Sequence, residues 1–131
     1  MQTFSVTTKQ RTEMIDITRD VSAAVASSGV RDGVCTVFIP HTTAGVTINE
    51  NADPDVQRDI MMEINKIVPL QDGYCHAEGN SAAHLKSSLF GCSAAVIVAG
   101  GRLRLGTWQS VFFCEFDGPR TREVWVQVTG T

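Results

Sequence analysis

The sequence contains no long apolar segment and no excess of positive charge. No apolar run approaches the ~20 residues that a membrane-spanning helix requires. The net charge of -3 gives no broad attraction to nucleic acid or to an acidic membrane surface. Residues 1–6 (Met-Gln-Thr-Phe-Ser-Val) lack the basic and apolar regions of a secretory signal. We therefore expect a cytoplasmic protein whose partners include neither nucleic acid nor membrane.

Cysteine is scarce and is not arranged in pairs. The four cysteines are Cys35, Cys75, Cys92 and Cys114, and they form no Cys-x-x-Cys motif. An even count alone does not make a disulfide framework in a chain that looks cytosolic. We therefore expect four free thiols, most of them buried.

Histidine is also scarce, and its three copies fall in two polar blocks. His41 lies in the block 40–55, whereas His76 and His84 lie in the block 76–88. Each block also carries carboxylates, amides and hydroxyls beside its histidines. Such a combination is costly to bury in an apolar core and natural in a metal or catalytic site. The two blocks are therefore the first candidates for function.

Length and composition predict one globular domain over residues 1–131. The chain is 43% hydrophobic and 19% charged, as is typical of soluble proteins. β-rich segments predict strands over 2–8, 34–39, 45–49, 94–99, 108–116 and 121–129. Helical spacing of apolar residues predicts one helix within residues 17–28 and two more over 54–67 and 81–90. Together these elements predict an α+β fold with two or three helices on a largely antiparallel sheet or sandwich.

Residues between these elements predict how they begin and how they connect. Asp53, which precedes a proline, is expected to cap the second helix, Thr18 the first, and Asn80 or Ser81 the third. The apolar residues of the second helix form one stripe that we expect to face the core: Val56, Ile60, Met61, Ile64 and Ile67. The turn residues 117–119 (Asp-Gly-Pro) predict that the last two strands form an antiparallel hairpin.

The three histidines are candidate metal ligands. Three neutral imidazoles are a common set for a zinc site that keeps its fourth position open. In one continuous helix His76 and His84 would lie ~12 Å apart along the axis, too far to share an ion. They can converge only if the chain turns at Gly79-Asn80 before a helix that carries His84. His41 would then join them from a separate strand end or from another subunit. The alternative is three unrelated, hydrogen-bonded histidines.

A helix that begins near Asn80 or Ser81 also suggests an anion site. Its free backbone N–H groups and positive dipole end attract phosphate or pyrophosphate. Ser81 adds a hydroxyl, and Lys86 and His84 can add positive charge. Simple helix capping explains an asparagine and a serine here equally well, but it does not account for the adjacent Glu78.

Two glutamates are the best carboxylates for chemistry. Glu50 and Glu78 lie in the histidine blocks, whereas Asp53 and Asp55 suit the start of a helix. Either glutamate is a candidate general base or a candidate ligand for a divalent cation.

Polar residues near the last strands are further candidates. Four arginines are possible phosphate clamps, although most arginines in such hairpins are only solvated: Arg102, Arg104, Arg120 and Arg122. Thr107 and Gln109 bring a hydroxyl and an amide to the start of a strand, where they can form a pocket wall. The alternative there is a strand bend beside an aromatic core residue.

Four blocks of the chain resemble the signature of the YjbQ family. They are 41–53 (His-Thr-Thr-Ala-Gly-Val-Thr-Ile-Asn-Glu-Asn-Ala-Asp), 76–86 (His-x-Glu-Gly-Asn-x-x-x-His-x-Lys), 101–109 (Gly-Arg-Leu-x-Leu-Gly-Thr-Trp-Gln) and 114–120 (Cys-Glu-Phe-Asp-Gly-Pro-Arg). They occur in the family's order and cover nearly the whole chain. The resemblance implies a small α+β sandwich that assembles as a homotrimer. It also implies a polar pocket near a subunit boundary for a metal ion or a phosphate-like anion, and a secondary thiamine phosphate synthase activity.

That activity joins a pyrimidine pyrophosphate to a thiazole phosphate and releases pyrophosphate. It needs a divalent cation and donors that stabilise the leaving group. We expect His41, Glu50 and Glu78 to act in catalysis, and His41, His76 and His84 to bind the metal. The residues expected to bind the phosphorylated substrate are Thr42, Thr43, Asn80, Ser81, Lys86, Arg102, Thr107 and Gln109. The ion is zinc or magnesium; imidazoles suit zinc, whereas magnesium prefers oxygen ligands.

Two other functions fit the same residues. One is a zinc-dependent hydrolase of a small phosphorylated or amide metabolite, in which the histidines hold the metal and Glu50 or Glu78 is the base. The other is a protein that binds and sequesters a metabolite or a metal without turnover. Zinc content and product formation distinguish these alternatives.

Overall fold

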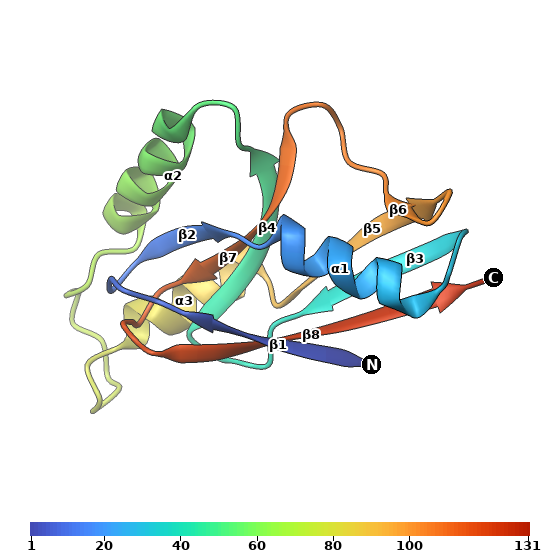
Figure 1. Ribbon diagram of the computed structural model, residues 1–131. Helices are drawn as coiled ribbons and strands as arrows, with labels where there is room; N and C mark the ends of the chain where they lie inside the picture. The colour runs from blue at the N-terminus through green and yellow to red at the C-terminus, as the bar shows by residue number, and fades with distance from the viewer.

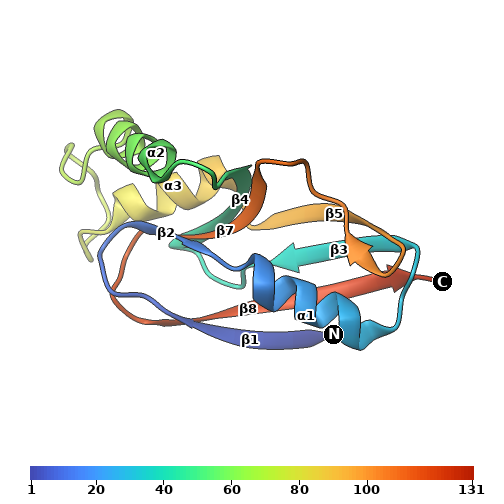
Figure 2. The ribbon, with the colours of Figure 1, turned by 45° about the horizontal axis from the view of Figure 1, so that its top comes forward.

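The computed structural model describes residues 1–131 as two antiparallel sheets and three helices (Figures 1 and 2). The larger sheet has the strand order β1 (Gln2–Thr7), β8 (Thr121–Gly130), β3 (Gly33–Phe38), β5 (Ser93–Ala99) and β6 (Arg102–Leu103). The smaller sheet has the order β2 (Glu13–Asp16), β7 (Gln109–Glu115) and β4 (Ala44–Glu50). The helices are α1 (Thr18–Ser28), α2 (Pro54–Ile67) and α3 (Ser81–Phe90). The predicted α+β class is therefore confirmed.

The main hydrophobic core joins α1 to both sheets. Val21 and Val25 of α1, Val126 of the larger sheet and Phe113 of the smaller sheet belong to one buried cluster. Burial of each such side chain contributes about 1.5–3 kcal/mol. No helix is both long enough and apolar enough to cross a membrane.

α3 covers the second face of the smaller sheet. Alternate residues of β7 point to opposite faces, so Phe113 enters the main core while Phe112 and Cys114 lie under α3. There they form a smaller cluster with Ala83 of α3 and with Phe116. This packing holds α3, and the histidine that it carries, against the sheet.

The cysteines are all free, as expected, but only half of them are buried. Cys35 and Cys114 are buried, whereas Cys75 and Cys92 are exposed. Burial raises the pKa of Cys114 to about 12 and that of Cys35 to about 11, so both thiols stay protonated at neutral pH.

α2 does not enter the core as its apolar stripe predicts. None of its residues is buried, and its main contact is with β2 at the edge of the smaller sheet. Met61 is half-buried, but Met62 is 55% exposed and Ile67 64% exposed. The predicted cap is confirmed, because the Asp53 carboxylate accepts a hydrogen bond from the Asp55 N–H. The apolar stripe therefore predicted the amphipathic helix correctly, but it did not predict how little of the helix is buried.

The predicted capping role of Thr18 is wrong. α1 begins after Ile17 without a side-chain capping bond. The Thr18 hydroxyl instead accepts a hydrogen bond from the Val111 N–H of β7, 93 residues along the chain, at 2.9 Å. The Thr18 hydroxyl, which the local sequence predicted as a helix cap, therefore makes a contact with a distant strand instead.

The last two strands do not form the predicted hairpin. β7 pairs with β2 and β4, whereas β8 pairs with β1 and β3 in the other sheet. The segment 116–120 therefore crosses from one sheet to the other instead of turning within one. Gly118 makes this crossing possible by close approach, because a Cβ at this position would lie 2.3 Å from the Gln10 carbonyl oxygen.

A buried ion pair lies where this crossing meets two others. Glu115, at the end of β7, and Arg122, at the start of β8, are 0% and 3% exposed and form hydrogen-bonded ion pairs. The Glu115 carboxylate also accepts a hydrogen bond from the hydroxyl of Thr8, which lies in the segment between β1 and β2. Arg122 also donates to the carbonyl and hydroxyl of Thr43, from the segment between β3 and β4. The pair thus ties three sheet-crossing segments together.

The pair also makes stability depend on pH. Burial by itself would raise the pKa of Glu115, but hydrogen bonds from Arg122, the Asp117 N–H and Thr8 outweigh burial and lower it. The pKa of the folded state therefore lies below that of the unfolded state. The stabilisation is present above the unfolded pKa and is lost as the pH falls through the folded value.

Replacing Arg122 with methionine should destabilise the fold strongly. The substitution leaves a buried carboxylate without its partner, which costs about 3–5 kcal/mol. Urea unfolding at neutral pH measures this loss. The matched control is Arg120→Met, which removes a half-exposed ion pair with Asp117 and should cost less than about 1 kcal/mol. Equal losses in the two variants would contradict the role of the buried pair.

Candidate functional site

His76 and His84 lie side by side at the start of α3. Their ring centroids are 5.4 Å apart, and the ring planes meet at 84°. Gly79 has a positive φ of 77°, and its N–H donates to the His76 carbonyl, so the chain reverses directly before α3. The turn predicted at this point therefore brings the two histidines together.

His84 links two neighbouring depressions on this surface. One, of about 480 Å³, is lined by Tyr74, Cys75, His76, Ser81, His84 and Leu85. The other, of about 560 Å³, is lined by His41, Thr42, His84, Ser87, Ser88, Gly91 and Cys92. We call the two depressions together the histidine groove. All three histidines of the chain line it, with His84 in the middle.

Two arginines lie on the other side of His41. A further depression of about 510 Å³ brings Arg120 and Arg122 next to His41 and Thr42. Arg122 is already held by Glu115 and Thr43, whereas Arg120 is exposed and bonds to Asp117. His41 therefore lies between the histidine groove and a positively charged surface.

His41 is fixed in one orientation by the backbone. Its Nε2 accepts a hydrogen bond from the Glu123 N–H at 2.9 Å, so this nitrogen carries no proton and Nδ1 carries it. Burial and, after it, the positive charge of Arg122 lower the pKa of His41 below its ordinary value. The side chain is therefore a neutral imidazole near pH 7, with Nδ1–H as its available donor.

The histidines do not form a complete metal site within one chain. No group of three or more His, Cys, Asp or Glu side chains lies close enough together to hold a metal ion. His41 uses Nε2 for the Glu123 N–H, which leaves His76 and His84 as the nearest pair of imidazoles. The Glu78 carboxylate lies 3.8 Å from His76 Nε2. A zinc ion bound by this pair would need its remaining ligands from outside the chain.

Lys86 does not share the site of His84. Successive residues of a helix are rotated by about 100°, so these two side chains point to nearly opposite sides of α3. Lys86 is 4% exposed, and its Nζ donates to Asn65 Oδ1 of α2 at 2.6 Å. Asn80 lies on the Lys86 side as well, where Nδ2 donates to Asp117 Oδ2 at 2.9 Å. The predicted capping bond from Asn80 is absent, because its amide faces Asp117 instead.

The other predicted site residues lie at the far ends of strands. Glu50 ends β4 opposite Gln109, about 20 Å along the strand from the Thr42 end, since each residue advances about 3.3 Å. Thr107 is exposed just before Gln109, whose side chain accepts the Gly106 N–H. Arg102 lies on β6, in a different depression beside the end of α1. One chain therefore does not bring these four residues to the histidine groove.

Thr43 is next to the groove but is already bound. Its hydroxyl and carbonyl both accept hydrogen bonds from Arg122, and the residue is 6% exposed. Thr42, in contrast, is exposed and lines the groove.

Several residues of the groove were not predicted from the sequence. Ser88 follows His84 by four residues, so helical spacing alone is a sufficient signal for it. Gly91 and Cys92 reach the groove only because β5 returns beside β4, and no local pattern indicates this.

The neutral state of His41 can be tested by NMR. We expect its pKa to lie below the ordinary value of a histidine and its Nε2 to be the unprotonated nitrogen. Long-range ¹H–¹⁵N spectra recorded over a pH series measure both, and His41→Gln identifies the signals. A protonated Nε2 at neutral pH would contradict the Glu123 hydrogen bond.

The sequence and the fold of this chain are similar to those of known proteins. The family model described as "UPF0047 protein YjbQ-like" matches residues 2–131. YugU of Bacillus subtilis is 50% identical over 131 residues, which cover 99% of both chains. The UPF0047 protein MJ1081 of Methanocaldococcus jannaschii is 49% identical over 127 residues, which cover 97% of this chain and 92% of the relative.

Solved structures agree with these matches. An uncharacterised conserved protein of the YjbQ/UPF0047 family from Clostridium acetobutylicum is 53% identical, with a TM-score of 0.97 over 98% of this chain and 100% of that one. A YbjQ-like protein of unknown function from Sulfolobus solfataricus is 32% identical, with a TM-score of 0.96 over 99% and 96% of the two chains. The matched residues span nearly the whole chain. The chain belongs to the UPF0047/YjbQ family.

Proposed function

We propose that this protein is an enzyme that binds a small phosphorylated metabolite in the histidine groove. The observation that carries the proposal is the position of His41, between His84 on one side and Arg120 on the other. The imidazole N–H of His41, hydroxyls and an exposed guanidinium are the donors that a phosphate or pyrophosphate needs.

We propose a transferase reaction of the thiamine phosphate synthase type. It joins a pyrimidine pyrophosphate to a thiazole phosphate and releases pyrophosphate. The Nδ1–H of His41, the Thr42 hydroxyl and the Arg120 guanidinium would stabilise negative charge on the leaving pyrophosphate. His84 and Ser88 would hold the partner substrate within the same groove.

Of the two expected catalytic glutamates, Glu78 suits this site better. It lies beside His76, whereas Glu50 is about 20 Å from the groove end of β4. We propose that Glu78 acts as the acid–base group. Glu50 would act in catalysis, and Thr107 and Gln109 would bind substrate, only if a neighbouring subunit presents them.

We further propose that the protein is a cytoplasmic homotrimer. The outer face of the larger sheet carries a group of exposed apolar side chains on two adjacent strands: Val34 (44% exposed), Phe38 (38%) and Ile97 (65%). Trp125 stacks on Phe38 with ring centroids 5.7 Å apart. Exposed apolar side chains gathered on one sheet face in this way are typical of a surface that contacts another protein.

Purified protein should produce thiamine phosphate from the two substrates in the presence of magnesium. His41→Ala and His84→Ala should each lower kcat/KM by about 100-fold or more, because each removes a donor to the reacting groups. Arg19→Ala, an exposed substitution on α1, is the matched control and should have no effect. Full turnover in His41→Ala would remove the groove from the mechanism.

A zinc-dependent hydrolase remains the second candidate, because His76 and His84 form a pair of imidazoles beside Glu78. We propose that a divalent cation, zinc or magnesium, binds there with further ligands from substrate, water or a second subunit.

Native mass spectrometry of protein purified without added metal tests both the assembly and the metal. We expect a species of three times the 14.2 kDa chain mass. Stoichiometric zinc that is lost in His76→Ala would favour the hydrolase. A metal-free trimer that is active only with added magnesium would favour the synthase. A monomer would contradict the proposed trimer.

A further inference from the structure

Lys86 is a buried cation without an anionic partner. It is 4% exposed, and none of the five ion pairs in the structure involves it. Its one hydrogen bond goes to the neutral amide oxygen of Asn65. An ammonium group has three N–H donors, and buried charges in proteins are normally paired. The side chain therefore has unused donors and an uncompensated charge.

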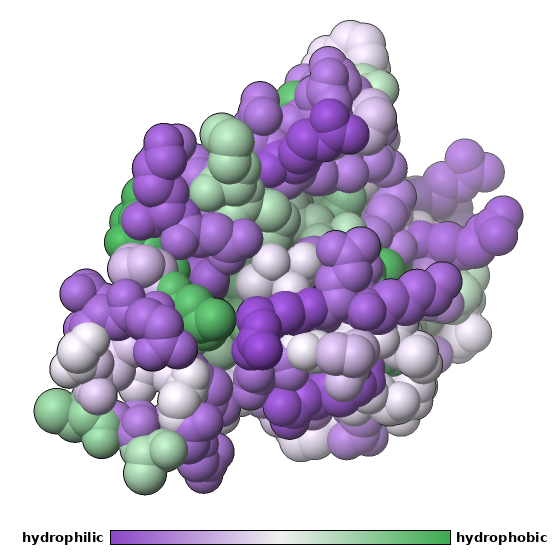
Figure 3. Space-filling view, turned by 90° about the vertical axis from the view of Figure 1, so that its left-hand side faces the viewer, coloured by the Kyte–Doolittle hydropathy of each residue, from purple (hydrophilic) through white to green (hydrophobic).

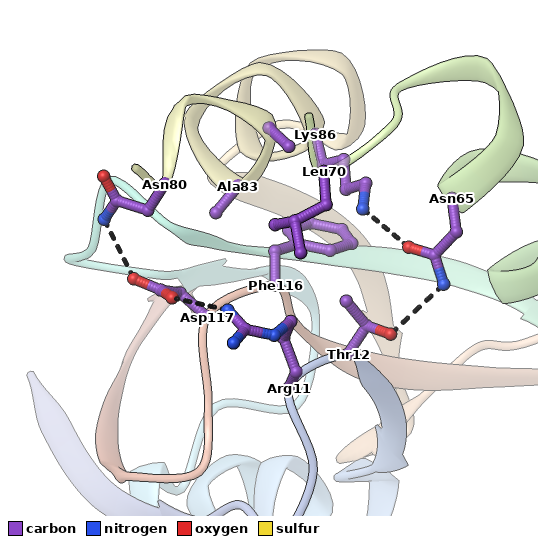
Figure 4. A pocket seen from close by; sticks show the side chains of 10 residues that line it. Arg11, Thr12, Asn65, Leu70, Asn80, Ala83, Lys86, Phe116 and Asp117 are labelled. Carbon is purple, nitrogen blue, oxygen red and sulfur yellow. Dashed lines mark hydrogen bonds and ion pairs between the residues drawn. The ribbon is translucent and has the colours of Figure 1, made fainter. Parts of the chain in front are cut away.

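These donors face a cavity of about 220 Å³ between α2, α3 and the segment that joins β1 to β2 (Figure 4). We call it the lysine pocket. Leu70, Ala83 and Phe116 form its apolar side, and Figure 4 shows the Phe116 ring between Lys86 and Asp117. Seen from outside, this end of the molecule is largely hydrophilic, with a few hydrophobic patches (Figure 3).

Positive charge exceeds negative charge in the lysine pocket. Arg11 enters it from the β1–β2 segment, and its ion pair with Asp117 is long, at 3.8 Å. Asp117 is already occupied by Arg120 at 3.1 Å and by Asn80 at 2.9 Å. The only carboxylate in the pocket therefore does not neutralise Lys86. Burial and, after it, the charge of Arg11 lower the pKa of Lys86, as expected for a cation that lacks its counter-ion.

We propose that the lysine pocket binds a small monocarboxylic acid. The carboxylate would accept hydrogen bonds from Lys86 Nζ and from Arg11, and a compact apolar body would lie against Leu70 and Phe116. One uncompensated charge favours a monoanion over a phosphate dianion. The volume is below the roughly 300–1,000 Å³ of pockets for drug-sized ligands, so the acid must be small.

This site is separate from the histidine groove. The two open on opposite sides of α3, since Ala83 and Lys86 line the pocket while Ser81 and His84 line the groove. The proposal therefore does not depend on the proposed synthase activity. If carboxylate binding fails, the synthase activity can still be tested, and the reverse also holds.

Titration of the full-length protein with butyrate and benzoate tests the proposal. We expect saturable binding, seen by NMR as shifts of the Asn65 side-chain amide and of the Ala83 backbone amide. The neutral analogues butyramide and benzamide should bind at least about tenfold more weakly, because they lack the charge that Lys86 would pair. Inorganic phosphate should compete poorly.

Three variants show whether carboxylate binding depends on the lysine pocket. Lys86→Met keeps an apolar side chain of similar length and should weaken carboxylate binding at least about tenfold. Lys66→Met, on the exposed side of α2, and His84→Ala, in the groove, should leave the affinity within about twofold. If Lys86→Met fails to fold, Lys86→Gln and the amide analogues provide the same comparison. Binding that survives loss of the Lys86 charge, equal binding of the amides, or a preference for phosphate would each overturn the proposal.

Discussion

The buried ion pair between Glu115 and Arg122 is the constraint on which the arrangement of this fold depends. It joins the end of β7 in the smaller sheet to the start of β8 in the larger sheet. Through Thr8 and Thr43 it also holds the β1–β2 and β3–β4 segments, which cross between the sheets as well. An uncompensated buried charge is costly, so the four groups are stable only when all the segments are in place. The same contacts fix the backbone of Glu123, which in turn orients His41.

α3 connects the fold to two different sites. One side of the helix carries His84 toward the histidine groove, and the other carries Lys86 into the lysine pocket. The helix is held between them because Ala83 belongs to one buried cluster with Phe112 of the smaller sheet and with Phe116, which follows β7. Groups only two residues apart in the sequence thus have separate surroundings: hydroxyls and imidazoles around His84, and around Lys86 a partly enclosed pocket lined by both charged and apolar side chains.

Much of the architecture followed from local pattern. Periodicity predicted all three helices and the longer strands, and the cap at Asp53 was predicted because its bond to the Asp55 N–H is local. The short strands β2 and β6 carry too few residues to show alternation. The predicted hairpin of the last two strands failed for a different reason. A turn sequence such as Asp-Gly-Pro permits a reversal, but Gly118 serves here in a crossing between sheets.

The sequence by itself determined the helices, the longer strands, the family and the meeting of His76 with His84, since a glycine turn next to a helix is decided by neighbouring residues. Only the tertiary structure decided where the remaining polar groups lie. It placed Glu50, Arg102, Thr107 and Gln109 away from the histidines, bound Thr43 to Arg122, and paired Lys86 with Asn65 of α2. The physical reason is that a strand about 20 Å long carries its two ends to opposite sides of a domain, whereas the separation of Lys86 from His84 already follows from helical spacing. The immediate sequence neighbours of a residue do not show which group pairs with its buried charge. They also do not show at which end of a sheet its side chain lies.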